Sequence, residues 1–170
     1  MLRYHATAMS VREPVHRTHL VARATPAEVY AVVTDFPAYA RLFPEFKQAR
    51  VVSTTGNVVR VEFRAEVVLA VRYVLDLACD PGALTVDWTF VEGEIVTGST
   101  GSWRFIAAGD GTTIDYRAAL DVKAPLPGFI LRKVTDGLVA ASIPAMFASI
   151  EREVRKRQAA PQAQPQARET

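Results

Sequence analysis

Apolar and polar residues alternate along the middle of the chain with a period of two, which is the pattern of strands that bury one face. Short turn sequences rich in Gly, Asp and Asn separate six such runs. We predict strands at residues 47–55, 58–67, 69–79, 84–91, 95–106 and 112–122, and a further strand at residues 15–24. No helical pattern separates the six, so they pair as an antiparallel meander, because parallel neighbours need long crossovers.

The segment from residue 127 to residue 157 has the helical period instead, and it is apolar almost all round, which predicts a buried helix. At roughly 1.5 Å per residue it spans about 45 Å, so a sheet that covers it has to curl around it. Pro144 lacks an amide donor and Gly137 loosens the preceding turn, so we expect a kink near Ala140. Two apolar stripes run along the helix, one through Ile130, Val134, Leu138, Ala141, Ala145 and Ala148, and one through Ile143, Phe147, Ile150 and Val154.

Between the first strand and the meander the sequence predicts two short helices that form a corner. Thr25, Pro26 and Glu28 give a hydroxyl cap, a proline at the first helical position and a capping box, so a helix runs to about residue 33. Pro37 disfavours helical geometry at the residue before it, and a second helical turn covers residues 38–42. The corner concentrates large apolar side chains, which have to cover something apolar: Phe36, Tyr39, Leu42, Phe43 and Phe46.

Size and composition predict one domain. The chain has 170 residues, of which 49% are hydrophobic, enough for one good core. We expect a flexible arm at residues 1–14, a folded domain at residues 15–157 and a disordered, Pro- and Gln-rich tail at residues 158–170. The formal net charge is only +2 and much of the basic excess lies at the end of the long helix, which argues against nucleic acid as the main partner.

The start of the chain lacks a signal-peptide pattern and no run approaches about 20 apolar residues, so we expect a cytoplasmic protein. Cys79 is the only cysteine, which excludes an intrachain disulfide and a cysteine-built metal site. No neighbouring base or cation is evident to lower its pKa, so we expect an inert thiol.

Catalytic side chains are scarce on the predicted inner face. The chain has three histidines, all before the first helix: His5, His16 and His19. We therefore expect no metal site and no histidine-based catalyst, and we assign no catalytic residue and no cofactor. Tyr73 and Tyr116 are the best polar candidates, because a buried phenol needs a partner, which is either a ligand carbonyl or the backbone and water.

The order of these elements is that of the helix-grip fold, and four motifs carry a family resemblance: Asp35-Phe-Pro-Ala-Tyr, Gly101-Ser-Trp-Arg-Phe, Gly109-Asp-Gly-Thr-Thr-Ile-Asp-Tyr and Ala124-Pro-Leu-Pro. With them the sequence resembles the polyketide cyclase/dehydrase and coenzyme Q-binding branch of the START/Bet v1-like (SRPBCC) superfamily, over about residues 16–157. The resemblance implies an α+β fold in which a curved antiparallel sheet of about seven strands wraps around the long C-terminal helix.

The resemblance also implies a hydrophobic cavity between the sheet and this helix. The inner face of the sheet supports it, because the face presents more ring surface than a helix stripe rich in alanine can cover. Residues that point inward by strand alternation, or that face them from the corner and the helix, form the predicted ligand-binding lining. They are Phe36, Phe43, Phe63, Tyr73, Leu75, Trp88, Phe90, Trp103, Phe105, Tyr116, Ile130, Val134 and Leu138.

Three functions are compatible with this fold. The leading hypothesis is non-catalytic binding or transport of a hydrophobic small molecule, such as an isoprenoid quinone or a lipid, with transient membrane contact for ligand exchange. The first alternative is an aromatic polyketide cyclase or dehydratase that polarises a carbonyl through Tyr73, Tyr116 or Arg104, although Arg104 points outward by alternation. The second is a ribosome-associated or other protein-interaction module. The sequence leaves the oligomeric state and the identity of the ligand open.

Overall fold

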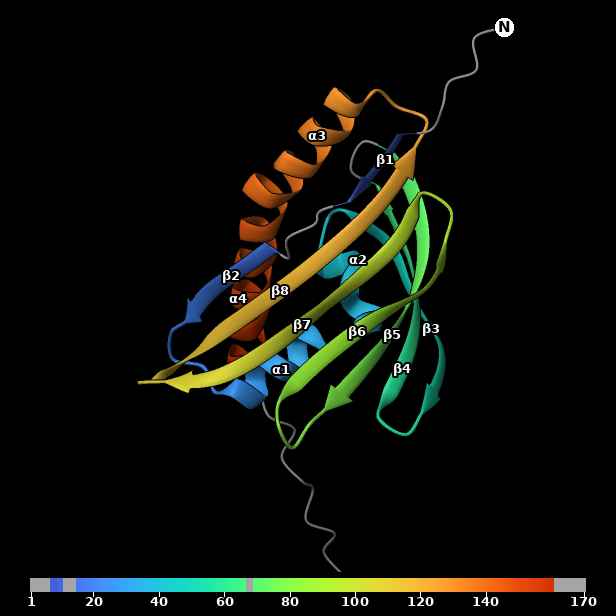
Figure 1. Ribbon diagram of the computed structural model, residues 1–170. Coiled ribbons are helices and arrows are strands. Elements are labelled where there is room, and N and C mark those ends of the chain that lie inside the picture. Colours follow the sequence, from blue (N-terminus) through green and yellow to red (C-terminus); the bar gives the residue numbers. More distant parts are fainter. Residues whose placement is uncertain (1–6, 11–14, 67–68, 161–170) are drawn as a thin grey trace, which may run out of the picture.

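A curved antiparallel sheet wraps around the long C-terminal helix in the computed structural model, which describes residues 7–10, 15–66 and 69–160 (Figure 1). The strands are β1 (Thr7–Ser10), β2 (Val15–Val21), β3 (Phe46–Thr55), β4 (Val58–Glu66), β5 (Ala70–Asp80), β6 (Thr85–Gly93), β7 (Val96–Ala108) and β8 (Gly111–Ala124). The helical segments are α1 (Pro26–Val33), η1 (Phe36–Ala38), α2 (Tyr39–Leu42), α3 (Gly128–Gly137), η2 (Leu138–Ser142) and α4 (Ile143–Ala159). The predicted helix-grip fold is confirmed.

The sheet is seven positions wide, as the sequence predicts. Its order is β1-β8-β7-β6-β5-β4-β3, and β2 also pairs with β8. Since β1 pairs with residues 121–124 of β8 and β2 with residues 112–118, the two strands follow one another along the same edge. The short strand β1 lies within the segment that we predicted as a flexible arm. Its four residues, Thr-Ala-Met-Ser, are too few to show a strand period.

The long helix is broken where the sequence predicts its kink. Five residues of π-helix, η2, separate α3 from α4 and include Ala140. Pro144 explains the break, because it has no N–H to donate to the carbonyl four residues earlier, and a widened turn accommodates the missing bond. The helix then continues to Ala159, two residues beyond the predicted end.

One prediction about this helix is wrong. We expected it to be buried all round, but the buried residues of α4 are Phe147, Ile150 and Val154 of one stripe together with the polar Ser149 and Glu153. The alanines of the other stripe, including Ala145 and Ala148, are exposed. Alanine adds little apolar surface, so a stripe of alanines tolerates water at small cost and does not indicate burial by itself.

The corner forms as its capping residues predict. The Glu28 backbone N–H donates to Thr25 Oγ1 at 3.2 Å, and the Thr25 backbone N–H donates to Glu28 Oε2 at 2.8 Å, which is the reciprocal capping box. The helix ends at Val33, and the Tyr39 hydroxyl donates to the carbonyl of Val33 at 2.5 Å from inside the core. The corner therefore carries its own hydrogen bonds and covers one end of the sheet's concave face (Figure 1).

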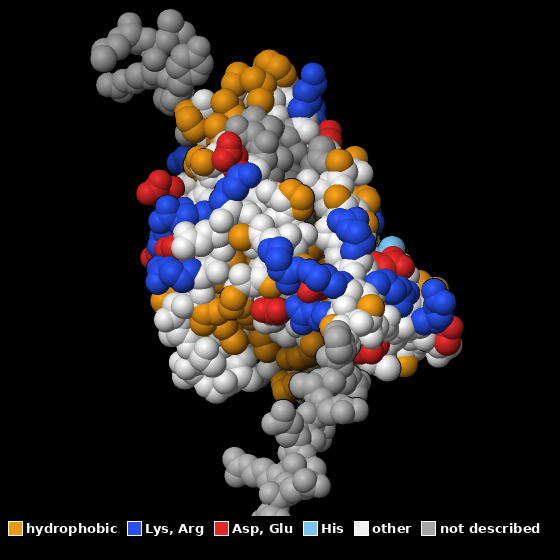
Figure 2. All heavy atoms as spheres, turned by 180° about the vertical axis from the view of Figure 1, so that it is seen from behind, with side chains coloured by type: hydrophobic (Ala, Val, Ile, Leu, Met, Phe, Trp, Pro, Cys, Tyr) orange, Lys and Arg blue, Asp and Glu red, His pale blue; other side chains and the backbone are white. Residues whose placement is uncertain are grey.

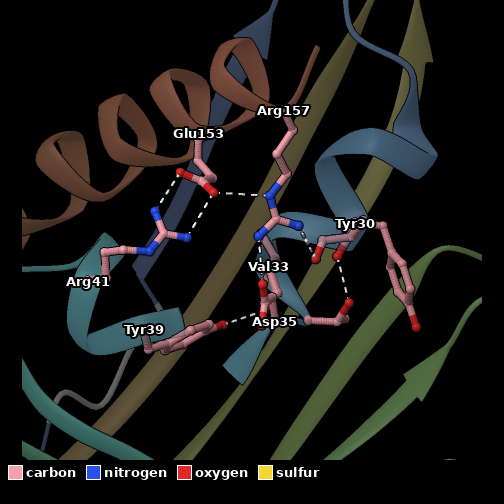
Figure 3. A network of polar contacts seen from close by, with 9 residues as sticks. Tyr30, Val33, Asp35, Tyr39, Arg41, Glu153 and Arg157 are labelled. Carbon is pink, nitrogen blue, oxygen red and sulfur yellow. Dashed lines mark hydrogen bonds and ion pairs between the residues drawn. The ribbon is translucent and has the colours of Figure 1, made fainter. Parts of the chain in front are cut away.

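A buried carboxylate joins α4 to this corner (Figure 3). Glu153 is only 6% exposed, and both its oxygens accept from the Arg41 guanidinium, at 2.9 and 3.0 Å. Arg157 donates to the same carboxylate at 3.1 Å and to Asp35 at 2.6 Å. The hydrogen bonds from Arg41, then those from Arg157, lower the pKa of Glu153 to about 2.

We predict that Glu153→Gln lowers the free energy of unfolding at pH 7 by about 2–3 kcal/mol, because hydrogen bonds to charged groups contribute roughly 1.5–3 kcal/mol. Glu153 has a pKa below that of the unfolded chain, so its contribution is complete above about pH 5 and is lost as the pH falls toward 2. Urea unfolding of both proteins between pH 7 and pH 2 measures this difference. Glu151→Gln, on the exposed side of the same helix, is the control, and an equal loss in both variants would contradict the prediction.

Candidate functional site

Two adjoining chambers lie between the concave face of the sheet and the C-terminal helix. The outer chamber, of about 250 Å³, is lined by Val15, Glu45, Phe46, Ala65, Val71, Tyr73, Val96, Tyr116, Ala118, Leu120, Thr135, Ser142, Ile143 and Met146. The inner chamber, of about 120 Å³, is lined by Tyr39, Phe43, Phe46, Phe63, Tyr73, Leu75, Leu77, Trp88, Trp103, Tyr116 and Met146. Four residues line both chambers and form the boundary between them: Phe46, Tyr73, Tyr116 and Met146.

Ring contacts fix the two boundary tyrosines. The Tyr116 ring lies 4.5 Å from the Trp103 ring and 5.9 Å from the Trp88 ring, measured between centroids. The Tyr73 ring stacks on Phe63 at 5.5 Å. These contacts come from inward positions of β4, β5, β6, β7 and β8, and they limit both phenols to narrow ranges of position.

A glycine on β7 makes room for one wall of the inner chamber. A Cβ atom at Gly101 would lie 2.0 Å from the Trp88 ring and 2.3 Å from the carbonyl oxygen of Arg117. Gly101 pairs with Trp88 across the sheet, so the indole lies flat over the space that a side chain would fill. The indole N–H of Trp88 donates to Ser99 Oγ at 3.0 Å, which fixes the ring in that place.

The hydroxyls of Tyr73 and Tyr116 have no hydrogen-bond partner among the described residues. In contrast, the buried hydroxyl of Tyr39 donates to a backbone carbonyl. Burial raises the pKa of both boundary phenols far above the physiological range, and the nearby Glu45 carboxylate raises it further. Each phenol is therefore a neutral donor that faces a mostly apolar space.

Few other polar groups line the chambers. Glu45 lies in the outer chamber, at the end of the corner, and its backbone carbonyl accepts from the Glu66 N–H at 2.8 Å. Thr135 and Ser142 line the same chamber from α3 and η2, and the Thr135 hydroxyl donates to the Leu131 carbonyl at 2.9 Å within the helix. The sequence reasoning did not find Glu45, because Glu45 follows Pro44 in a turn and strand alternation says nothing about its direction.

The structure brings most of the predicted lining together but not all of it. Among the predicted residues, Tyr73 and Tyr116 line both chambers, and the inner chamber adds Phe43, Phe63, Leu75, Trp88 and Trp103. Neither chamber is lined by Phe36, Phe90, Phe105 or Ile130, as far as the described residues show. The side chains of Val134 and Leu138 lie outside the described part of the structure.

Phe36 and Phe105 point inward as predicted but fill the core instead of facing open space. The Phe105 ring lies 6.0 Å from the Tyr30 ring of α1, and the Phe36 ring lies 5.5 Å from the Tyr39 ring. Both residues are at the end of the concave face that the corner covers, where packing leaves no room. Strand alternation predicts the face of a side chain, but not where along the strand the covering helix departs from the sheet.

No group of three or more His, Cys, Asp or Glu side chains within the described residues could hold a metal ion. Burial raises the pKa of the Cys79 thiol to about 11, so the thiol is neutral at physiological pH. Arg104, a candidate for polarising a carbonyl, lies on the outer face, where its guanidinium donates to Asp87 at 2.7 Å and to the Trp103 carbonyl at 2.9 Å.

Residues 23–147 match the family model described as polyketide cyclase/dehydrase and lipid transport. The chain belongs to this family. Family membership supports two broad activities, binding of a hydrophobic small molecule and polyketide cyclisation, and does not decide between them. A search of curated proteins finds no match. No helix in the described part of the chain is long and apolar enough to cross a membrane.

Solved structures show the same fold at low sequence identity. TTHA0849 from Thermus thermophilus is 22% identical, with a TM-score of 0.76 over 85% of this chain and 98% of that chain. The Zhui aromatase/cyclase from a Streptomyces species is 19% identical, with a TM-score of 0.75 over 86% and 97%. A START superfamily protein from Mycobacterium smegmatis is 17% identical, with a TM-score of 0.70 over 85% and 99%.

We predict that Gly101→Ala lowers the free energy of unfolding by about 3 kcal/mol, because the new methyl group collides with the Trp88 ring and a backbone carbonyl. Gly82→Ala, in an exposed turn, is the control and should change stability by less than about 0.5 kcal/mol. Chemical unfolding gives the free energies, and near-ultraviolet circular dichroism reports the packing of the indole. A Gly101→Ala protein as stable as the control would show that the sheet accommodates the methyl group by moving.

Proposed function

We propose that this protein binds a hydrophobic small molecule, such as an isoprenoid quinone or another lipid-like compound with an oxygen acceptor, and does not convert it. The observation that carries the proposal is the pair of half-buried phenols, Tyr73 and Tyr116, which line both chambers and whose hydroxyls have no hydrogen-bond partner among the described residues. A ligand oxygen between the two phenols can accept a hydrogen bond from each of them in place of water.

The size of the chambers supports a ring with a short chain. The combined volume of the two chambers falls in the lower part of the range of roughly 300–1,000 Å³ that small-molecule sites occupy. The aromatic walls of the inner chamber suit a flat ring, and the outer chamber suits the first part of a chain. Apolar surface buried there contributes about 25 cal/mol per Å², so affinity needs few polar contacts.

The mouth of the cavity is proposed to lie between the end of the corner and the break in the helix. The outer chamber is lined by Glu45 and Phe46 on one side and by Ser142 and Ile143 on the other. The proposed mouth lies farther along the helix than the start of α3. The π-helical turn η2 is the proposed point of movement, because it interrupts the regular hydrogen bonding of the long helix.

Transient membrane contact during exchange is part of the same proposal. Hydrophobic atoms gather at the end of the molecule where α3 begins (Figure 2), and Phe129 in that helix is 67% exposed. Arg132 and Lys133, one turn further on the same helix face, are also exposed. An exposed ring beside cations suits a lipid surface.

We also propose a cytoplasmic location. Cys79 is the only cysteine in the sequence, and a chain without a disulfide fits a reducing compartment.

We predict that Ala118→Phe abolishes binding of a short-chain quinone, because the ring fills the outer chamber. Tyr73→Phe and Tyr116→Phe should each weaken binding by no more than about 1.5 kcal/mol, the loss of one hydrogen bond. Titration of the purified proteins measures both effects, and native mass spectrometry of protein prepared without detergent identifies any molecule that copurifies. Arg117→Phe, on the outer face of the same strand, is the matched control. Quinone binding that survives Ala118→Phe unchanged would refute the proposed cavity.

Polyketide cyclisation is the second candidate, and one observation favours it. The Glu45 carboxylate lines the same chamber as the two phenols, so a base and two neutral acids share one space. A carboxylate can accept a proton from a carbon next to a carbonyl while a phenol donates a hydrogen bond to the carbonyl oxygen. The name of the Zhui protein, an aromatase/cyclase of similar fold, agrees with this candidate.

If the protein is a cyclase, Tyr73→Phe or Tyr116→Phe should lower turnover of a polyketide substrate by about 100-fold or more and leave substrate affinity nearly unchanged. The expected result under the binding proposal is the reverse, with no turnover in any variant and a small change in affinity. Single-turnover kinetics with separate binding measurements distinguish the two. Turnover that collapses in a phenylalanine variant would replace the binding proposal with the cyclase.

A further inference from the structure

The described lining of the cavity carries negative charge only. Among the described residues that line the two chambers, Glu45 is the only charged one, and none is Lys, Arg or His. The other polar lining groups are hydroxyls and indole N–H groups, which carry no charge. From the described lining residues, a ligand in the outer chamber therefore meets one negative charge and no positive charge.

The basic side chains near the site are directed elsewhere. On β4 and β5, Arg64 and Arg72 alternate with the inward residues and reach Glu62 on the outer face, Arg72 at 2.6 Å and Arg64 at 3.8 Å. Arg41, in the corner, is bound to Glu153. Lys47, two residues beyond Glu45, is exposed and does not line either chamber. Within the described part of the chain, no cation forms an ion pair with Glu45.

We propose that Glu45 makes the cavity selective against anions, so that its ligand is a neutral molecule with an oxygen acceptor, such as a quinone, ketone, ester or alcohol, and not a free carboxylate or phosphate. This inference rests on the proposed binding function and narrows its ligand class. The two phenols donate to the acceptor oxygen, while the uncompensated carboxylate repels a second negative charge in the same chamber.

The expected size of the effect follows from Coulomb's law. At an effective dielectric constant of about 20, two like charges about 10 Å apart repel strongly enough to change a dissociation constant by about tenfold, and by more at shorter range. The two phenols stay protonated because burial raises their pKa, so they contribute no charge of either sign and Glu45 alone sets the charge of the described lining. Discrimination by at least about tenfold between an acid and its neutral ester is therefore expected.

The test uses one chain length with different polar ends: decanoate, methyl decanoate and decanol, with a short-chain quinone as the ring-containing probe. All are titrated at pH 8 and below their aggregation limits into the wild-type protein, Glu45→Gln and Glu66→Gln. Glu66 is the matched control, because it lies beside Glu45 in space, is exposed and lines neither chamber. Circular dichroism and thermal unfolding establish that each variant is folded.

The wild-type protein and Glu66→Gln should bind the ester, the alcohol and the quinone at least about tenfold more tightly than decanoate. Glu45→Gln should bind decanoate about tenfold more tightly than the wild-type protein does, so that the ratio of decanoate to methyl decanoate affinity rises about tenfold. Equal binding of acid and ester by the wild-type protein, or a ratio that Glu45→Gln does not change, would overturn the charge selectivity alone. Failure of every probe to bind to any of the proteins would overturn the proposed binding function itself, and the selectivity with it.

Discussion

The clamp of Arg41 and Arg157 on the Glu153 carboxylate determines where the C-terminal helix meets the rest of the fold (Figure 3). A curved sheet has to cover its concave face, and α4, which packs against α1 and α2, covers the end of that face next to the corner. The clamp, together with the buried face of α4, fixes the close contact at the corner. The helix therefore departs from the sheet toward η2 and α3, and this divergence leaves the outer chamber, lined by Ser142 and Ile143.

The alternation of side chains along the strands places the charged residues on the outer face of the sheet and the aromatic rings on the concave face. Each inward ring on β4 and β5 has an arginine or a carboxylate as its neighbour, so ion pairs collect on the outer face. Glu62, only 5% exposed although it points outward, is covered by Arg50, Arg64 and Arg72. The hydrogen bond from Arg72 lowers the pKa of Glu62, so the group remains ionised under its arginines. These pairs keep cations away from the concave face, and Glu45 is left there without one.

The sequence was sufficient to predict elements that depend on local rules. The strands of the meander, the capping box at Thr25 and the break before Pro144 each follow from a residue type at a fixed spacing. Features that depend on distances between elements could not be predicted. Phe63 and Phe105 both point inward, yet only Phe63 lines a chamber, because α1 and the corner fill the space beside Phe105. Met146 lines both chambers although helical periodicity placed it on neither apolar stripe.

The rigidity of the polar groups bears on whether the cavity binds or catalyses. Tyr116 is held by two indole rings, and Tyr73 by Phe63, so the donors are preorganised. The Glu45 carboxylate has no such support, since no described side chain or backbone N–H hydrogen-bonds to it, and only its backbone carbonyl is tied to Glu66. A general base has to be held within about 0.5 Å of its working position. A carboxylate that only repels anions acts through its field and needs no such precision. The uneven support of these groups therefore favours a binding cavity with a charge preference over an assembled active site.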